Sequence, residues 1–188
     1  LGDLRTIYRY PVTVSVADEA WAAVSASRNT VTDVIESGSV VYGVNTGFGR
    51  LAQTRIDAAQ LSELQRNLVH SHATGVGPLL DDAAVRLVMV MKINALARGY
   101  SGVRREVIEL LVRMVNRGVF PAIPSKGSVG ASGDLAPLAH MSLPVIGSGH
   151  VRMDGRLLES REAFVAVGLE PIELNVKEGL GLLNGTQV

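Results

Sequence analysis

The residues with the clearest chemical potential lie in a glycine-rich run that extends from Lys126 to Asp134. A Walker A loop requires Gly-Lys followed by Ser or Thr, but Lys126 stands before the glycines, at the wrong end of a phosphate cradle. A serine-hydrolase elbow requires Gly-x-Ser-x-Gly, whereas Gly133 follows Ser132 directly. The order of residues therefore argues against both a phosphate-binding loop and a serine nucleophile.

A third possibility is chemistry of the backbone itself. If a tight turn brings the Gly133 nitrogen against the Ala131 carbonyl carbon, the tripeptide Ala131-Ser132-Gly133 can cyclise and lose water. Ser132 can then lose its hydroxyl to leave an electrophilic methylidene, while Gly133 has no Cβ to hinder the attack. The compressed backbone costs about 1 to 3 kcal/mol per unusual position. Spacing alone favours the alternative of an ordinary Gly-Ser loop, since such a tetrapeptide arises easily by chance.

Other polar residues stand at positions where chemistry is possible. Tyr42 lies at the mouth of a loop from Gly43 to Gly49, whose glycine spacing fits neither a dinucleotide fingerprint nor a kinase loop. Ser71-His72 follows a stripe of leucines, and Asn184 stands where a helix C-cap is expected. Taken alone, Tyr42 fits a core or strand-edge position and Asn184 fits a cap as well as a binding site.

The apolar spacing predicts a mainly α-helical chain with minor β structure. A short β-prone run covers Val40 to Val44, a hairpin is expected around Asp154-Gly155, and Val119 to Gly133 is expected to be one long irregular loop. Helices are expected from Val16 to Glu36, from a capping box at Asp57 and Gln60 through Leu61 to Leu68, from Asp81 or Asp82 toward Gly99, from Ser101 toward Gly118, from Asp134 to Pro144, from Ser160 to Gly168 and from Val176 to Leu183.

The composition narrows the range of partners. Eighteen basic and eighteen acidic residues cancel without forming a block, which argues against binding nucleic acid or anionic lipid. The most apolar stretch, Ala84 to Leu96, is interrupted by Arg86 and Lys92, so no membrane span is expected. The four histidines lack the paired spacing of a zinc site, and the absence of cysteine fits a cytoplasmic protein. We therefore expect no metal and a small, roughly neutral ligand.

In several segments the chain resembles the aromatic amino acid ammonia-lyases and aminomutases, which use a methylidene-imidazolone (MIO) group. The resemblance runs in order and spacing over essentially the whole chain. The segments that carry it are Tyr42 to Gly49, Ser71-His72, Gly127 to Leu138, Lys177 to Leu180 and Leu183 to Gln187.

The resemblance implies that Ala131, Ser132 and Gly133 form the MIO group autocatalytically and that Ser132 supplies its methylidene carbon. It also implies that Tyr42 is the base that removes the substrate's β-proton, and that Asn184 supports the MIO group and the substrate. A phenol has a pKa of about 10, so Tyr42 needs neighbours that lower its pKa.

Ser71 and His72 fall where the family reads the substrate ring, and a Ser-His pair resembles members that act on L-histidine and release trans-urocanate. An imidazole offers one donor and one acceptor, which this pair can satisfy. The implied fold is the N-terminal, MIO-bearing domain of a fumarase/aspartase-like helical protein that assembles as a homotetramer. Residues 1–188 are expected to be a single truncated domain, inactive alone, without the C-terminal helical bundle.

Two alternatives stay open at this point. A related tyrosine or phenylalanine lyase, or an aminomutase, would share the cofactor; some aminomutases also carry Ser-His, although Gln187 resembles the members that act on histidine. A non-catalytic chain with an inert Gly-Ser loop would keep an unmodified mass.

Overall fold

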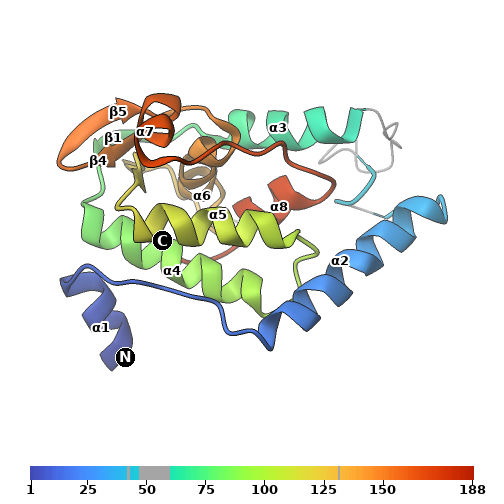
Figure 1. Cartoon of the computed structure of the whole chain (residues 1–188). Helices are drawn as coiled ribbons and strands as arrows, with labels where there is room; N and C mark the ends of the chain where they lie inside the picture. The colour runs from blue at the N-terminus through green and yellow to red at the C-terminus, as the bar shows by residue number, and fades with distance from the viewer. Residues whose placement is uncertain (42, 47–59, 131) are drawn as a thin grey trace.

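The computed structural model describes residues 1–41, 43–46, 60–130 and 132–188, and its main mass is helical with two small sheets (Figure 1). This confirms the expected mainly α chain with minor β structure. The helices are α1 (Gly2–Arg9), α2 (Ala20–Glu36), α3 (Leu61–His72), α4 (Asp82–Ala97), α5 (Arg105–Asn116), α6 (Leu135–Ser142), the 3₁₀ helix η3 (Leu143–Ile146), α7 (Ser160–Val167) and α8 (Glu178–Leu183). The strands are β1 (Val76–Leu79), β2 (Phe120–Pro121), β3 (Pro124–Lys126), β4 (His150–Met153) and β5 (Arg156–Glu159).

Helices α4 and α5 lie side by side and form the centre of the molecule (Figure 1). The side chain of Asp81 caps α4 by accepting a hydrogen bond from the Ala84 amide at 2.7 Å, as the sequence predicts. In α5 the apolar residues recur on one face, so Val107, Leu111 and Met114 are buried, whereas Arg105 is exposed.

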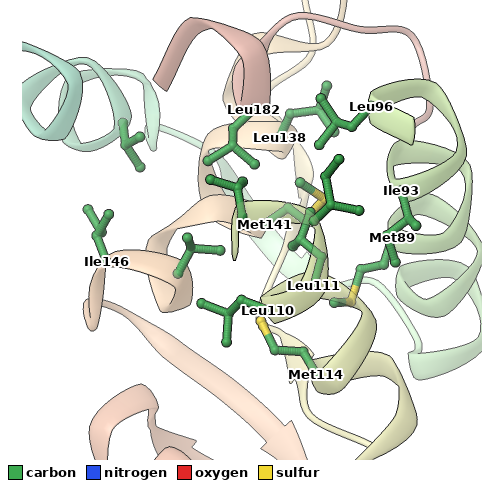
Figure 2. Packing of buried hydrophobic residues seen from close by; sticks show 14 of the residues in the cluster. Met89, Ile93, Leu96, Leu110, Leu111, Met114, Leu138, Met141, Ile146 and Leu182 are labelled. Carbon is green, nitrogen blue, oxygen red and sulfur yellow. The ribbon is translucent and has the colours of Figure 1, made fainter. Parts of the chain in front are cut away.

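The main hydrophobic core forms where α4, α5, α6 and α8 meet (Figure 2). Burying one leucine side chain contributes about 1.5 to 3 kcal/mol, so this cluster dominates the stability of the fold. Its labelled members are Met89, Ile93, Leu96, Leu110, Leu111, Met114, Leu138, Met141, Ile146 and Leu182. The helices that carry the predicted site are therefore supported by a shared core.

The predicted hairpin is confirmed, since β4 and β5 pair in antiparallel register around Asp154-Gly155. Both turn residues have positive φ, 51° and 73°, as a two-residue type I′ turn requires. Strand β2 extends this hairpin to a three-stranded sheet in the order β2-β4-β5.

The expectation of one irregular loop from Val119 to Gly133 is wrong in its first half, because β2 and β3 lie within it. Pro121 lies in an edge strand and Pro124 begins β3, two positions where a missing amide donor is tolerated. Strand β3 pairs with β1, which the sequence did not predict. The irregular part is thus confined to the residues that follow Lys126.

Two other local predictions are also wrong. The described residues of the run from 40 to 44 form no strand, because the Asn45 side chain accepts from the Val41 amide at 2.9 Å and stabilises a turn. Helix α5 begins at Arg105 and not at Ser101. The Arg104 amide donates to the Glu178 carboxylate at 2.9 Å, so a distant acidic side chain lies at the start of the helix.

Smaller differences concern where helices begin. Helix α2 begins at Ala20 and not at Val16, and α8 begins at Glu178 and not at Val176. No side-chain cap is formed by Gln60 at the start of α3, and Asp57 of the predicted capping box lies outside the described residues.

Helices α3, α6 and α8 pack against one another. The predicted substrate-reading pair is at the end of α3, the glycine-rich run leads into α6, and Asn184 follows α8. The fold therefore gathers three segments that are far apart in the sequence.

Candidate active site

The backbone around Ser132 and Gly133 has an unusual conformation. Ser132 has φ of 58°, a left-handed value that is rare for a residue with a side chain, and Gly133 has φ of 103°. Ser132 is exposed in the described structure. Two consecutive positive φ values make a tight turn of the kind that a backbone cyclisation requires.

Gly133 cannot be replaced by a larger residue without displacing its neighbour. A Cβ at this position would lie 2.3 Å from the Gly185 carbonyl oxygen, which is backbone and cannot turn aside. The Asp134 amide donates to the same oxygen at 2.8 Å. The chain at 185 therefore presses directly against the turn.

The segment that follows α8 runs alongside the turn and is joined to it by polar contacts. The Asn184 Nδ2 donates to the Ser132 carbonyl oxygen at 3.3 Å, and the Val188 amide donates to the Asp134 Oδ2 at 3.3 Å. Asn184 is also the C-cap of α8, which confirms the cap interpretation of this residue. Hereafter we call residues 184–188 the clamp segment.

Asp134 has a different part from the one that the sequence predicts. It is the N-cap residue of α6, but its side chain forms no capping hydrogen bond. Its Oδ1 instead accepts from the Ser128 hydroxyl at 2.6 Å, while its Oδ2 receives the Val188 amide. The carboxylate thus joins the two ends of the glycine-rich run to the clamp segment.

Lys92 anchors the clamp segment from the side of the core. This lysine of α4 is 1% exposed, and its Nζ donates to the Asn184 carbonyl oxygen at 2.7 Å. Burial lowers the pKa of Lys92 to about 8, because a charged ammonium is poorly solvated there. From the sequence alone, Lys92 is only an interruption of an apolar stretch. That interruption is the one feature of the sequence from which its role could have been suspected.

Ser71 and His72 form a local hydrogen-bonded group at the end of α3. The His72 Nδ1 lies 2.9 Å from the Leu68 carbonyl oxygen and 3.2 Å from the Ser71 hydroxyl, which itself donates to Leu68 at 3.1 Å. A carbonyl oxygen only accepts, so Nδ1 carries the proton and Nε2 is the acceptor nitrogen of the ring. The pair therefore presents an acceptor in a fixed tautomer.

His140 connects this pair to the helix that follows the turn. Its Nε2 accepts from the Gly75 amide at 2.9 Å, three residues beyond His72. Burial lowers the pKa of His140, which favours the neutral ring that can accept. Sequence analysis counted His140 only among the histidines that form no metal site.

The structure brings Ser132, Gly133 and Asn184 into direct contact and places Ser71 with His72 at a neighbouring helix end. No hydrogen bond joins these two groups within the part of the chain that the structure describes. The packing of α3 on α6 and α8 and the His140 contact relate them. Tyr42 and Ala131 were also predicted as site residues, and both lie outside the described residues.

The described ranges contain neither a cluster of metal ligands nor a membrane-spanning helix. No three His, Asp or Glu side chains there gather as metal ligands would. None of the described helices is long and apolar enough to cross a membrane.

Known proteins match this chain over its whole length. The aromatic amino acid lyase family matches residues 1–188. The histidine ammonia-lyase of Salmonella arizonae is 56% identical over 187 residues, which cover 100% of this chain and 37% of that protein.

Solved structures agree with the sequence match. The tyrosine aminomutase from Streptomyces globisporus superposes with a TM-score of 0.91 at 40% identity, over 99% of this chain and 35% of its own. The histidine ammonia-lyase from Trypanosoma cruzi gives 0.89 at 36% identity, over 98% of this chain and 35% of its own.

The chain spans about 37% of the length of the curated relative, in agreement with the expected N-terminal part of a longer ammonia-lyase fold. The family match covers every residue, and the superposed structures share the overall fold of the chain. The chain therefore belongs to the aromatic amino acid lyase family.

Proposed function

We propose that the full-length protein containing this chain is a carbon-nitrogen lyase that eliminates ammonia from L-histidine to give trans-urocanate. The proposal includes an MIO group that forms from Ala131, Ser132 and Gly133 without metal or nucleotide. The observation that carries it is the turn at Ser132-Gly133, held against Gly185 with Asn184 on the Ser132 carbonyl oxygen.

The described residues fit the formation of such a group. In the closure, a bond forms between the Gly133 nitrogen and the Ala131 carbonyl carbon. The Ala131 oxygen leaves as water with the amide hydrogens of Gly133 and Ser132, and the bond between the Ala131 carbon and the Ser132 nitrogen becomes double. The Ser132 hydroxyl leaves as a second water with the Cα hydrogen. The left-handed φ at Ser132 and the absence of a Cβ at Gly133 favour this approach of backbone atoms. The Ser132 carbonyl oxygen is retained, so the hydrogen bond from Asn184 persists through closure.

The residues of the chain then have separate tasks. Once formed at Ser132, the group would supply an electrophilic carbon for the substrate amine. Asn184 donates to the Ser132 carbonyl oxygen and thereby stabilises negative charge there. Tyr42 is proposed to remove the β-proton, for which its phenol needs a pKa well below the ordinary value of about 10.

Histidine is the proposed substrate because of the tautomer at His72. Its Nδ1 is used by the Leu68 carbonyl oxygen, so Nε2 can accept a hydrogen bond from the N–H of a substrate imidazole. A phenyl ring offers no such donor, so this arrangement discriminates by an unmet hydrogen bond. The names of the histidine ammonia-lyases that match the chain are in line with this proposal.

The first experiment is an intact-mass measurement on the full-length protein, followed by a histidine-to-urocanate assay. A deficit of two waters, about 36 Da, is expected from the closure chemistry. An unmodified mass would instead support the inert Gly-Ser loop and reject the proposal.

An aminomutase is the second candidate, because a tyrosine aminomutase is among the solved structures that superpose well. It would use the same group and return ammonia to the β-carbon. Product analysis separates the two: a β-amino acid from histidine or tyrosine would favour the aminomutase, and urocanate alone would favour the lyase.

Assembly and compartment are part of the same proposal. We expect a cytoplasmic homotetramer with a small amino acid as its only ligand. The 188-residue chain alone is expected to be inactive. Size measurement of the full-length protein and an assay of the isolated chain test these expectations.

A further inference from the structure

Lys92 is a charged side chain where an apolar one would pack. It stands in the middle of α4, is 1% exposed, and neighbours Ile93 of the main core. The described residues include no carboxylate within 4.0 Å of its ammonium. An unpaired buried charge is costly, so a contribution to stability does not account for this lysine.

Among the described residues, the one hydrogen bond that the Lys92 ammonium forms is to the Asn184 carbonyl oxygen, at 2.7 Å. That oxygen belongs to the peptide between Asn184 and Gly185. The two residues that this peptide joins both contact the turn region: the Asn184 side-chain amide donates to the Ser132 carbonyl oxygen, and the Gly185 carbonyl oxygen accepts from the Asp134 amide. Lys92 therefore fixes the two residues from which the clamp segment contacts the turn.

We propose that Lys92 is a positioning residue that fixes the Asn184-Gly185 peptide and so holds the turn at Ser132-Gly133 in its compressed geometry. This inference rests on the proposed function, since it assigns Lys92 to the closure of the MIO group and to its later use. Within the described part of the chain, the Lys92 ammonium is hydrogen-bonded to the clamp segment and not to Ser132 or Gly133, so Lys92 acts through the clamp segment.

The same contacts indicate how the loss of the Lys92 hydrogen bond would change the turn. A clamp that is free to move away from α4 would carry the Gly185 carbonyl oxygen away from Gly133, where it lies 2.3 Å from the position of a Cβ. The turn would then relax toward an ordinary loop. Both the extent of closure and the turnover of each closed molecule depend on this contact.

The test is Lys92→Met in the full-length protein, since methionine fills the same space and removes the donor. The matched control is Ile93→Val, the next residue of α4, which loosens the core without touching the clamp segment. Three quantities are measured for each variant: the fraction of folded molecules with the two-water mass deficit, the turnover per molecule with that deficit, and the melting temperature.

Lys92→Met is expected to melt at or above the wild-type temperature. The mass-deficient fraction should fall, and turnover per mass-deficient molecule should fall by at least about tenfold, as the loss of one hydrogen bond from a charged donor predicts. Ile93→Val should melt lower and keep a full mass deficit and normal turnover. A purely structural lysine predicts the opposite pattern.

A Lys92→Met protein with the wild-type mass deficit and turnover would overturn the proposal. If Lys92→Met does not fold, Lys92→Leu is measured next, and failure of both means that the lysine serves the fold as a whole, which also overturns it. The intact mass of the wild-type protein is measured first. If the wild-type protein lacks the two-water deficit, the proposed function itself is rejected, independently of Lys92.

Discussion

The core between α4, α5 and α6 and the turn at Ser132-Gly133 are held in place by different means. In the core, each side chain touches many apolar neighbours, and Leu110, Leu111 and Leu138 are fully buried (Figure 2). The turn is exposed at Ser132 and is fixed by single hydrogen bonds: Asn184 donates to the Ser132 carbonyl oxygen, and the Asp134 amide, directly after the turn, donates to the Gly185 carbonyl oxygen. Many weak contacts tolerate the loss of one, whereas a few directional contacts do not.

Because of this difference, the core determines the stability of the fold, whereas the turn determines whether the closure can occur. Loss of a methyl group from the core costs free energy of unfolding but leaves the helices in their places. Loss of one atom at the turn costs little free energy and removes the geometry on which closure depends. Mutations in the two regions should therefore change different observables.

The largest expected effect is that of Ser132→Ala in the full-length protein. Alanine has no hydroxyl to lose, so no methylidene can form, and turnover should fall by at least about a thousandfold. The melting temperature should hardly change, because the side chain is exposed. Intact mass, turnover and thermal melting are measured together.

Ser125→Ala is the control, since Ser125 is an exposed serine of β3, outside the turn. It should match the wild type in all three measurements. Undiminished turnover in Ser132→Ala would show that the turn has no part in catalysis. The core and the turn would then not differ in the way proposed.

The next effect belongs to the core. Leu111→Ala removes a fully buried side chain of α5 and should lower the free energy of unfolding by about 2 to 5 kcal/mol. Molecules that remain folded should carry the full mass deficit, because the clamp segment is not touched. Denaturant titration measures the first quantity and mass spectrometry the second. If the mass deficit decreased in proportion to the free energy of unfolding, closure at the turn would depend on the core, and the two regions would not act separately.

Gly133→Ala probes the turn through its backbone. The added Cβ would meet the Gly185 oxygen at 2.3 Å, and the left-handed φ adds strain, together about 1 to 3 kcal/mol. The mass-deficient fraction should fall sharply. Gly155→Ala is the control, since Gly155 also has positive φ but no atom lies within 4 Å of its Cβ position. A mass deficit as large in Gly133→Ala as in Gly155→Ala would show that the close approach of Gly133 to Gly185 is not required for closure.

The sequence predicted the elements whose signals are local. Helix α4 follows from Asp81 and its apolar stripe, and the β4–β5 hairpin follows from Asp154-Gly155. Both depend on residues a few positions apart. Strand β1 and the true start of α5 were missed because they depend on β3 and on Glu178, which are distant in the chain.

The site shows the same division. Family resemblance indicated Ser132, Gly133 and Asn184, and the structure brings these three together. The contact from Lys92 comes from a residue outside every motif, and the side chain of Asp134, which lies in the glycine-rich run, contacts Ser128 and Val188 where the sequence predicts a helix cap. A lysine in an apolar helix indicates that its ammonium has a polar partner. Only the fold shows that this partner is the Asn184 carbonyl oxygen.

The smallest expected effect lies at the junction of the two regions, where His140 of the core helix α6 accepts from the Gly75 amide beyond His72. Burial lowers its pKa from the ordinary 6.5, so the unfolded chain binds a proton more readily than the folded one. The stability that His140 contributes is therefore fully present above pH 6.5 and decreases as the pH falls below that value. His140→Gln keeps an acceptor and removes the titration, so the difference in unfolding free energy between wild type and variant should shrink or change sign as the medium is acidified.

Protonation of His140 also removes the acceptor that holds the Gly75 amide. The KM for histidine should therefore rise over the same pH range in the wild type, and rise less in the variant. If unfolding changes with pH but KM does not, His140 belongs to the core alone; a parallel change in both would mean that this histidine couples the core to the substrate pair.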